Sequence, residues 1–346
     1  MKNLVIGISG INAIDNPGPG VAVARSLKED ADLNVTTIGL AYDAMEPGIY
    51  LDWVVDRSYL MPYPSVGGEA VVDRLLEIKA RHGLDLVIPN LDSELPIYIR
   101  YAEELKSHGI AVMVPTMQQF RLRSKDQLMA AAPSFGCEAP ATVVLSGPGQ
   151  LDAALATLGL PLMIKGCLYE AYCADSAAAA HYYANKLAEE WGWPVLVQRI
   201  VTGEHLNVVG LGDGTGGHLG LVGLKKLSMT KLGKIQTGVT VTHPGMLAAA
   251  ERFIRESRWR GPFELECIVD GDHIHLIEIN PRFPAWCYLA TGVGLNLPAR
   301  LVRHQLGLPI IGGTDYPAGR LFIRYSYEVV ADMSHFQSLV TTGADQ

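Results

Sequence analysis

The segment FELECIVDGDHIHLIEINPR, residues 263–282, carries the strongest structural pattern in the chain. Apolar and polar residues alternate on both sides of Gly271, which is typical of two antiparallel strands joined by a short turn. Because side chains alternate between the two faces of a strand, Glu278 and Asn280 share one face. A hairpin that turns near Gly271 can bring Glu266 opposite Glu278. The segment therefore predicts two carboxylates and an amide at close range.

Two like charges that face each other in a sheet repel, so an acidic pair in such apolar strands requires a compensating cation. Mg2+ with nucleotide phosphates is the simplest such cation, because it prefers oxygen ligands from a few carboxylates and from phosphates. The alternative is a hairpin whose acidic face is solvated. Arg282 favours the ligand-binding interpretation, since its guanidinium offers a fixed fork to a carboxylate or phosphate.

The composition limits the classes of protein to which the chain can belong. Its 346 residues suit two or three packed units, and 49% hydrophobic against 18% charged residues indicates a folded core throughout. A formal net charge of −8 argues against nucleic acid or an anionic membrane as partner, since both need a basic surface. No stretch is apolar for long enough to span a bilayer. The chain start shows no signal peptide and the five cysteines lack CxxC spacing, so we expect a cytoplasmic protein.

The first 117 residues alternate between strand and helix patterns. Further strands after the one at the start are expected at 34–40, 84–89 and 110–114, with helices after Gly20 and over 69–82 and 95–108. Strands that alternate with helices predict a parallel sheet covered on both faces. We therefore place a Rossmann-like α/β domain at 1–117.

The rest of the chain has a different, α+β character. A small region at 118–197 combines a strand that ends in Lys165 with an alanine-rich helix. The region 198–310 is rich in strands joined by glycine turns, so its sheet should be largely antiparallel. The tail, 311–346, shows no clear pattern.

The hairpin resembles that of the ATP-grasp superfamily, and within it the branch of carbamoyl-phosphate synthetase, biotin carboxylase and related carboxylate–amine ligases. The likeness covers about residues 1–305. It implies an ATP-grasp fold with an N-terminal domain (1–117), a lid subdomain (118–197) and a C-terminal subdomain with the metal site (198–310). It also implies ATP and two Mg2+ ions, for which Mn2+ can substitute. The metal ligands would be Glu266, Glu278 and Asn280, with Arg282 as the catalytic arginine and Glu264 as the competitor for the first ligand position.

Upstream motifs agree with this resemblance in their order. Arg123-Ser124-Lys125-Asp126 and the strand that ends in Lys165 resemble segments whose lysines contact the ATP phosphates, and Lys165 is also a catalytic candidate. The stretch 195–204 resembles the hinge behind adenine, with Gln198, Arg199 and Val201 near the purine and Glu204 on the ribose. Lys225 and Lys226 are further phosphate or substrate candidates, and the alternative is a basic strand end.

The chain departs from the family pattern at two places. Gln198 stands where an acid is usual, and the loop over 165–172 lacks the turn rich in glycine and serine that many relatives lay over the phosphates.

A glycine-rich turn after the first strand does not match GxGxxG, which disfavours NAD binding.

The resemblance implies an ATP-dependent ligase that activates a carboxylate as an acyl phosphate and joins it to an amine. The alternatives are a carboxylase-type enzyme that acts on bicarbonate and a non-catalytic nucleotide-binding protein on the same fold. The expected partners are a small-molecule or peptide carboxylate and an amine nucleophile, and a homodimer is compatible with the family. The identity of both substrates cannot be read from the sequence.

Overall fold

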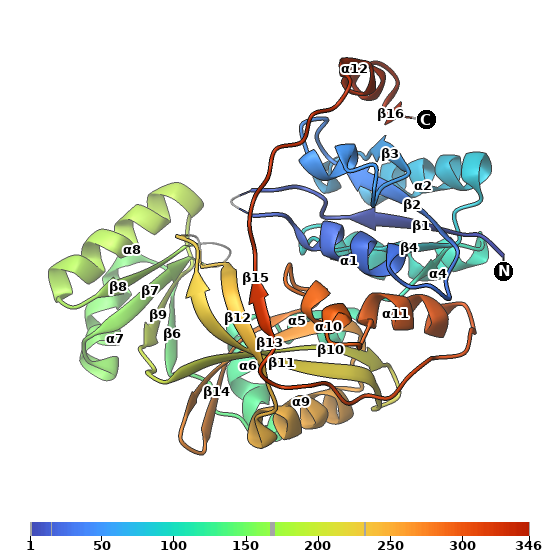
Figure 1. The fold of residues 1–346 in the computed structure, drawn as a ribbon. Helices are drawn as coiled ribbons and strands as arrows, with labels where there is room; N and C mark the ends of the chain where they lie inside the picture. The colour runs from blue at the N-terminus through green and yellow to red at the C-terminus, as the bar shows by residue number, and fades with distance from the viewer. Residues whose placement is uncertain (1, 15, 167–169, 232, 346) are drawn as a thin grey trace.

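The computed structural model of the protein describes residues 2–14, 16–166, 170–231 and 233–345 (Figure 1). The tip of the predicted lid loop, 167–169, lies outside the described residues. Three sheets organise the described chain, and each is built mainly from one part of the sequence. None of the described helices combines the length and the apolarity that crossing a membrane requires.

The first sheet has six strands in the order β16-β3-β2-β1-β4-β5. The five strands from the N-terminal part pair in parallel, as predicted, and only β16 is antiparallel. Helix α1 lies on one face, and α2, α3 and α4 pack in the core of the other. The strands are β1 (Leu4–Ser9), β2 (Val35–Ala41), β3 (Arg57–Leu60), β4 (Leu86–Ile88), β5 (Ala111–Val112) and β16 (Ala344–Asp345).

The helices of this layer are α1 (Pro19–Lys28), α2 (Gly68–His82), α3 (Leu95–Arg100) and α4 (Ala102–Ser107), with short 3-10 turns at Pro47–Tyr50 and Pro64–Val66. The helical segment expected around 95–108 forms as two short helices, because the chain breaks at Tyr101, where φ is −100° and ψ is 11°. This break lets both short helices bury an apolar face in one core, through Tyr98 and Leu105.

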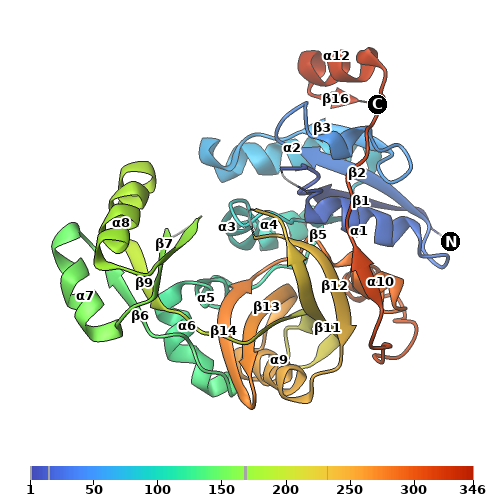
Figure 2. The same ribbon diagram turned by 60° about the vertical axis from the view of Figure 1, so that its left-hand side comes forward.

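The second sheet has four strands in the order β6-β9-β7-β8 and is covered by two helices. Figure 2 shows it set apart from the other sheets, on the side of the molecule away from β1. Its elements are β6 (Thr142–Leu145), α7 (Leu151–Leu158), β7 (Leu162–Gly166), β8 (Ala171–Ala174), α8 (Ala177–Trp191) and β9 (Val195–Arg199), with a 3-10 turn at Pro148–Gln150. The 3-10 turn at Ala132–Phe135 packs instead in the core of the third sheet.

The third sheet has six strands in the order β14-β13-β10-β11-β12-β15, and every pair is antiparallel, as predicted. One face packs against α6 and α9, and the other shares a core with α1 through α10 and α11. Its elements are α5 (Met117–Arg121), α6 (Lys125–Ala131), β10 (Glu204–Asp213), β11 (His218–Met229), β12 (Ile235–Val241), α9 (Pro244–Ser257), β13 (Arg260–Asp270), β14 (His273–Asn280), α10 (Tyr288–Gly292) and α11 (Leu297–Gln305).

The tail that lacked a clear pattern links two sheets. β15 (Leu321–Ile323) pairs with β12 at the edge of the third sheet, and the chain then runs along the molecule to α12 (Met333–Thr342) and β16 on the first sheet (Figure 1). Leu339 and Ala344 are buried there. The tail is therefore a structural part of both layers.

Candidate active site

The hairpin of β13 and β14 has the register that the sequence pattern predicts. Glu266 pairs with Glu278, and Glu264 pairs with Asn280, with an irregularity in the ladder directly after Glu266. Gly271 forms the turn with a φ of +59°, a left-handed conformation that favours glycine. The hairpin thus places three carboxylates and one amide on two nearby cross-strand pairs.

Glu264 lies at the inner end of this group, where it is only 4% exposed. Its carboxylate accepts hydrogen bonds from Asn207 Nδ2 at 2.6 Å, from Trp286 Nε1 at 2.6 Å and from Asn280 Nδ2 at 3.0 Å. Burial, together with the charge of Glu266, raises the pKa of Glu264 to about 7. Three protein donors already satisfy this carboxylate, so it fits a supporting role better than that of first metal ligand.

Glu266 differs from Glu264 because a lysine ammonium contacts its carboxylate. Lys226 Nζ donates to Glu266 Oε2 at 2.5 Å, and Asn280 Nδ2 donates to Glu266 Oε1 at 3.1 Å. Burial raises the pKa of Glu266, but the Lys226 ammonium outweighs it and the net pKa lies below the usual value. Glu266 is therefore ionised in the group, as a metal-binding carboxylate must be.

Glu278 is the most accessible of the three, with 45% of its side chain exposed. Lys125 Nζ lies 3.9 Å from Glu278 Oε1 and donates to the Ile277 carbonyl at 3.1 Å. Ser124 precedes this lysine as the residue at the N-terminal end of α6, so the start of a helix holds Lys125 over the hairpin. Lys125 and Glu278 thus meet at the open side of the carboxylate group.

Lys165, at the end of β7, donates to Gln198 Oε1 at 2.6 Å. Burial lowers the pKa of Lys165 to about 8, and the positive charge of Lys125 acts in the same direction. Gln198 itself is buried and donates to Thr142 Oγ1 at 2.8 Å. Because an amide carries no charge, this glutamine orients the lysine without neutralising it.

The other hinge candidates lie farther along the same segment. Arg199 is exposed, and its Nη2 donates to the Leu158 carbonyl at 3.3 Å, while Val201 is half-buried just beyond β9. Glu204 and Lys225 form an ion pair with each other, and both are partly exposed. Because side chains alternate along β11, Lys226 and not Lys225 faces the acidic group.

Arg282 connects the hairpin to the first sheet. It donates to Asn280 Oδ1 at 3.2 Å and to the Phe283 carbonyl at 3.3 Å, and its Nε lies 3.3 Å from Asp92 Oδ1. Arg123 Nη2 lies 3.3 Å from the other oxygen of Asp92. Asp92 follows β4 at the carboxyl edge of the parallel sheet, where ligands of such sheets usually bind. Asp92 therefore lies between two guanidinium groups at this edge.

Two residues of the group have little signal in the sequence. Asn207 appears only as one polar residue in an apolar strand, where it pairs with Glu266, and Trp286 lies in a loop without a motif. The histidines of the hairpin face the other way, as strand parity predicts, because His273 and His275 both lie beside Glu138. His273 Nδ1 and Glu138 Oε1 are 2.6 Å apart.

The donors fit Mg2+ that arrives with phosphates. Among the described residues, no group of three or more His, Cys, Asp and Glu side chains is arranged so that it could hold a metal ion. Glu266, Glu278 and Asn280 offer oxygen ligands only, and Mg2+ usually takes one or two carboxylates together with substrate phosphates and water. Lysines beside the same group suit the phosphates.

The architecture matches that of several solved enzymes. N5-carboxyaminoimidazole ribonucleotide synthetase from Thermus thermophilus aligns with a TM-score of 0.66 at 18% identity, over 90% of this chain and 80% of its own. Biotin carboxylase from Campylobacter jejuni aligns with a TM-score of 0.67 at 14% identity, over 90% of this chain and 72% of its own. L-amino acid ligase from Bacillus licheniformis aligns with a TM-score of 0.59 at 16% identity, over 82% of this chain and 67% of its own. No family model matches the chain, and neither does any curated protein.

The three sheets and their order along the chain therefore define an ATP-grasp fold. Within that fold, the chain is similar both to an L-amino acid ligase and to the biotin carboxylase domain of a 2-oxoglutarate carboxylase, which was solved with MgADP and bicarbonate.

Proposed function

We propose that the protein is an ATP-grasp ligase that forms a carbon–nitrogen bond between a carboxylate and an amine, with release of ADP and phosphate. The observation that carries the proposal is the hairpin register, which sets Glu266 against Glu278 with lysines on both sides. Solved structures with this fold hold ADP in one case and MgADP with bicarbonate in another. These neighbours support ATP and Mg2+ as the ligands of this chain.

In the proposed complex, Glu266, Glu278 and Asn280 would hold Mg2+, which would neutralise charge on the phosphates. Lys125 and Lys165 would bind the phosphates of ATP. The segment from Gln198 to Val201 passes behind adenine, Glu204 contacts the ribose, and Lys225 steadies Glu204 through their ion pair.

The chemistry proposed for the chain needs no protein nucleophile. The substrate carboxylate attacks the γ-phosphate of ATP, ADP leaves, and the amine then displaces phosphate from the acyl phosphate. Arg282 stabilises the negative oxygen in both steps, because a fixed guanidinium aimed at developing charge lowers the barrier without reorganisation. Closure of the lid excludes the water that would otherwise hydrolyse the acyl phosphate.

A pairwise screen of carboxylates and amines for ADP release, with mass detection of the product, tests this function. We expect ADP release only with a matching carboxylate, and loss of at least about a hundredfold in rate for Glu278→Ala and for Lys165→Ala. Glu138→Gln, on the opposite face of the hairpin, is the matched control and should keep the wild-type rate. Wild-type rates in both active-site variants would overturn the proposal.

A further inference from the structure

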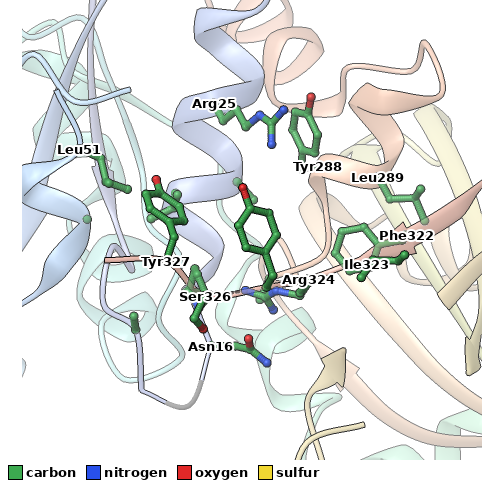
Figure 3. Close-up of a pocket in the computed structure, with 18 of the residues that line it drawn as sticks. Asn16, Arg25, Leu51, Tyr288, Leu289, Phe322, Ile323, Arg324, Ser326 and Tyr327 are labelled. Carbon is green, nitrogen blue, oxygen red and sulfur yellow. Dashed lines mark hydrogen bonds between the residues drawn. The ribbon is translucent and has the colours of Figure 1, made fainter. Parts of the chain in front are cut away.

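A large pocket lies between α1, the loop after β1, the segment after Arg282 and the C-terminal tail (Figure 3). Its volume is about 970 Å3, which lies at the upper end of the range of small-molecule sites. Ala285 and Tyr288 form part of its wall and follow Arg282 along the chain, so one short segment borders both the pocket and the proposed reaction centre.

Aromatic side chains dominate the open part of this pocket. Trp53 is 49% exposed, Tyr325 75% and Tyr327 48%, although each contributes to the wall. In Figure 3, Tyr327 lies on the side of Leu51, opposite Tyr288 and Leu289. Exposed aromatic groups that converge on one cavity are typical of a ligand site, because flat apolar surface gains free energy when a ligand covers it.

One side of the pocket is held rigid by a charged network. Arg25 Cζ lies 3.8 Å from the centre of the Tyr288 ring, and Arg25 Nε lies 2.8 Å from Glu29 Oε1. Tyr288 Oη donates to the other oxygen of Glu29 at 2.6 Å. The Arg25 charge is thus balanced, and the Tyr288 ring is fixed in the wall.

The tail adds positive charge to the pocket. Arg320 and Arg324 flank β15 and both line the cavity, whereas Glu29 is the one acidic residue among the described lining residues. Arg324 donates to the Pro17 carbonyl, at the end of the pocket near the loop after β1. Burial raises the pKa of the Cys287 thiol, and the positive charge of Arg324 opposes this.

We propose that this pocket binds the carboxylate substrate, and that this substrate carries an aromatic or apolar body. Its carboxylate would lie at Arg324, and its body would lie between α1 and the tail. The inference rests on the proposed ligase function and adds the substrate class. It also assigns substrate specificity to residues of the C-terminal tail, a role that the motifs of the hairpin do not predict.

Ligand-observed NMR with 3-phenylpropionate as the probe tests the pocket without ATP or metal. We expect 3-phenylpropionate to bind the full-length protein at least about tenfold more tightly than 3-phenylpropionamide, because the amide lacks the charge-assisted hydrogen bonds. Acetate should bind more weakly than 3-phenylpropionate, since it has no body to cover the aromatic wall. Equal affinity for the acid and its amide would overturn the proposal.

Substitutions of pocket residues test whether 3-phenylpropionate binds in this pocket. Arg324→Gln and Tyr327→Ala should each weaken 3-phenylpropionate binding by about tenfold, while Arg81→Gln, an exposed arginine of α2, should leave it unchanged. Tyr327→Ala replaces a half-exposed side chain, so it keeps the test valid if Arg324→Gln fails to fold. Unchanged binding in folded Tyr327→Ala would overturn the assignment.

The same variants separate this inference from the function. Glu278→Ala should bind 3-phenylpropionate normally although its rate of ADP release is strongly reduced. Binding of the probe without ADP release from any carboxylate would contradict the ligase function and with it the role of the pocket as a substrate site. ADP release whose KM for the carboxylate is unaffected by Tyr327→Ala would contradict the pocket alone.

Discussion

At the scale of single residues, the charge state of each acid in the proposed centre depends on the side chains beside it. Glu264 and Glu266 are two residues apart on one face, yet protein donors surround the first and a lysine ionises the second. Strand parity is sufficient to predict that both acids face Glu278 and Asn280. It cannot predict which acid receives Lys226, because that depends on how β11 lies beside β10.

Lys165 gives a prediction for the pH dependence of ATP binding. Its pKa of about 8 means that the ammonium loses its proton as the pH rises through 8, and a neutral amine attracts phosphates less. ATP affinity should therefore fall between pH 7 and pH 9. In Lys165→Arg this step should disappear, because the guanidinium stays charged over the whole range. Calorimetric titration of ATP at both pH values measures the effect, and an unchanged wild-type affinity would contradict it.

At the scale of elements, the strand and helix patterns predicted most of the first and third sheets, since apolar periodicity reports which face is buried. The break at Tyr101 and the pairing of β15 and β16 were not predictable in this way. The two strand pairings arise from contacts between residues far apart in sequence, Thr237 with Ile323 and Tyr59 with Ala344. A strand of two or three residues carries too few side chains for a periodic pattern.

The turn from β1 to α1 depends on Gly20, where a Cβ would lie 2.1 Å from the Ser9 carbonyl oxygen. Gly20→Ala should therefore destabilise the protein by about 3 kcal/mol, because the backbone that it meets cannot move aside cheaply. Gly149→Ala is the matched control, since a Cβ there meets no atom within 4 Å. Urea unfolding followed by circular dichroism compares the two, and equal midpoints would show that the turn tolerates a side chain.

At the scale of the whole molecule, α1 and α11 join the first and third sheets into one core. Asp30, just after α1, forms two hydrogen bonds of 2.8 Å with Arg303 of α11, and both side chains are largely buried. The Arg303 guanidinium holds the pKa of Asp30 below its usual value. Breaking this pair leaves a buried charge without its partner.

Asp30→Asn should lower the free energy of unfolding by about 3 kcal/mol at neutral pH. Because the folded pKa is lowered, the pair contributes fully above the ordinary Asp value of about 4 and is lost as the pH falls through the folded pKa. The difference between wild type and variant should therefore shrink between pH 5 and pH 2, roughly the window of that titration. Urea unfolding across this range measures it, with exposed Glu103→Gln as control, and a pH-independent difference would rule out the ion pair as its source.

The central claim is that the hairpin binds Mg2+ together with ATP, and calorimetry with a non-hydrolysable ATP analogue tests it directly. Wild-type protein and Glu138→Gln should bind the analogue at least about tenfold more tightly with Mg2+ than without it. Glu278→Gln should lose most of this gain, because it removes a charged ligand from the face opposite Glu138. A Glu278→Gln variant that keeps the full effect of Mg2+ would contradict the account.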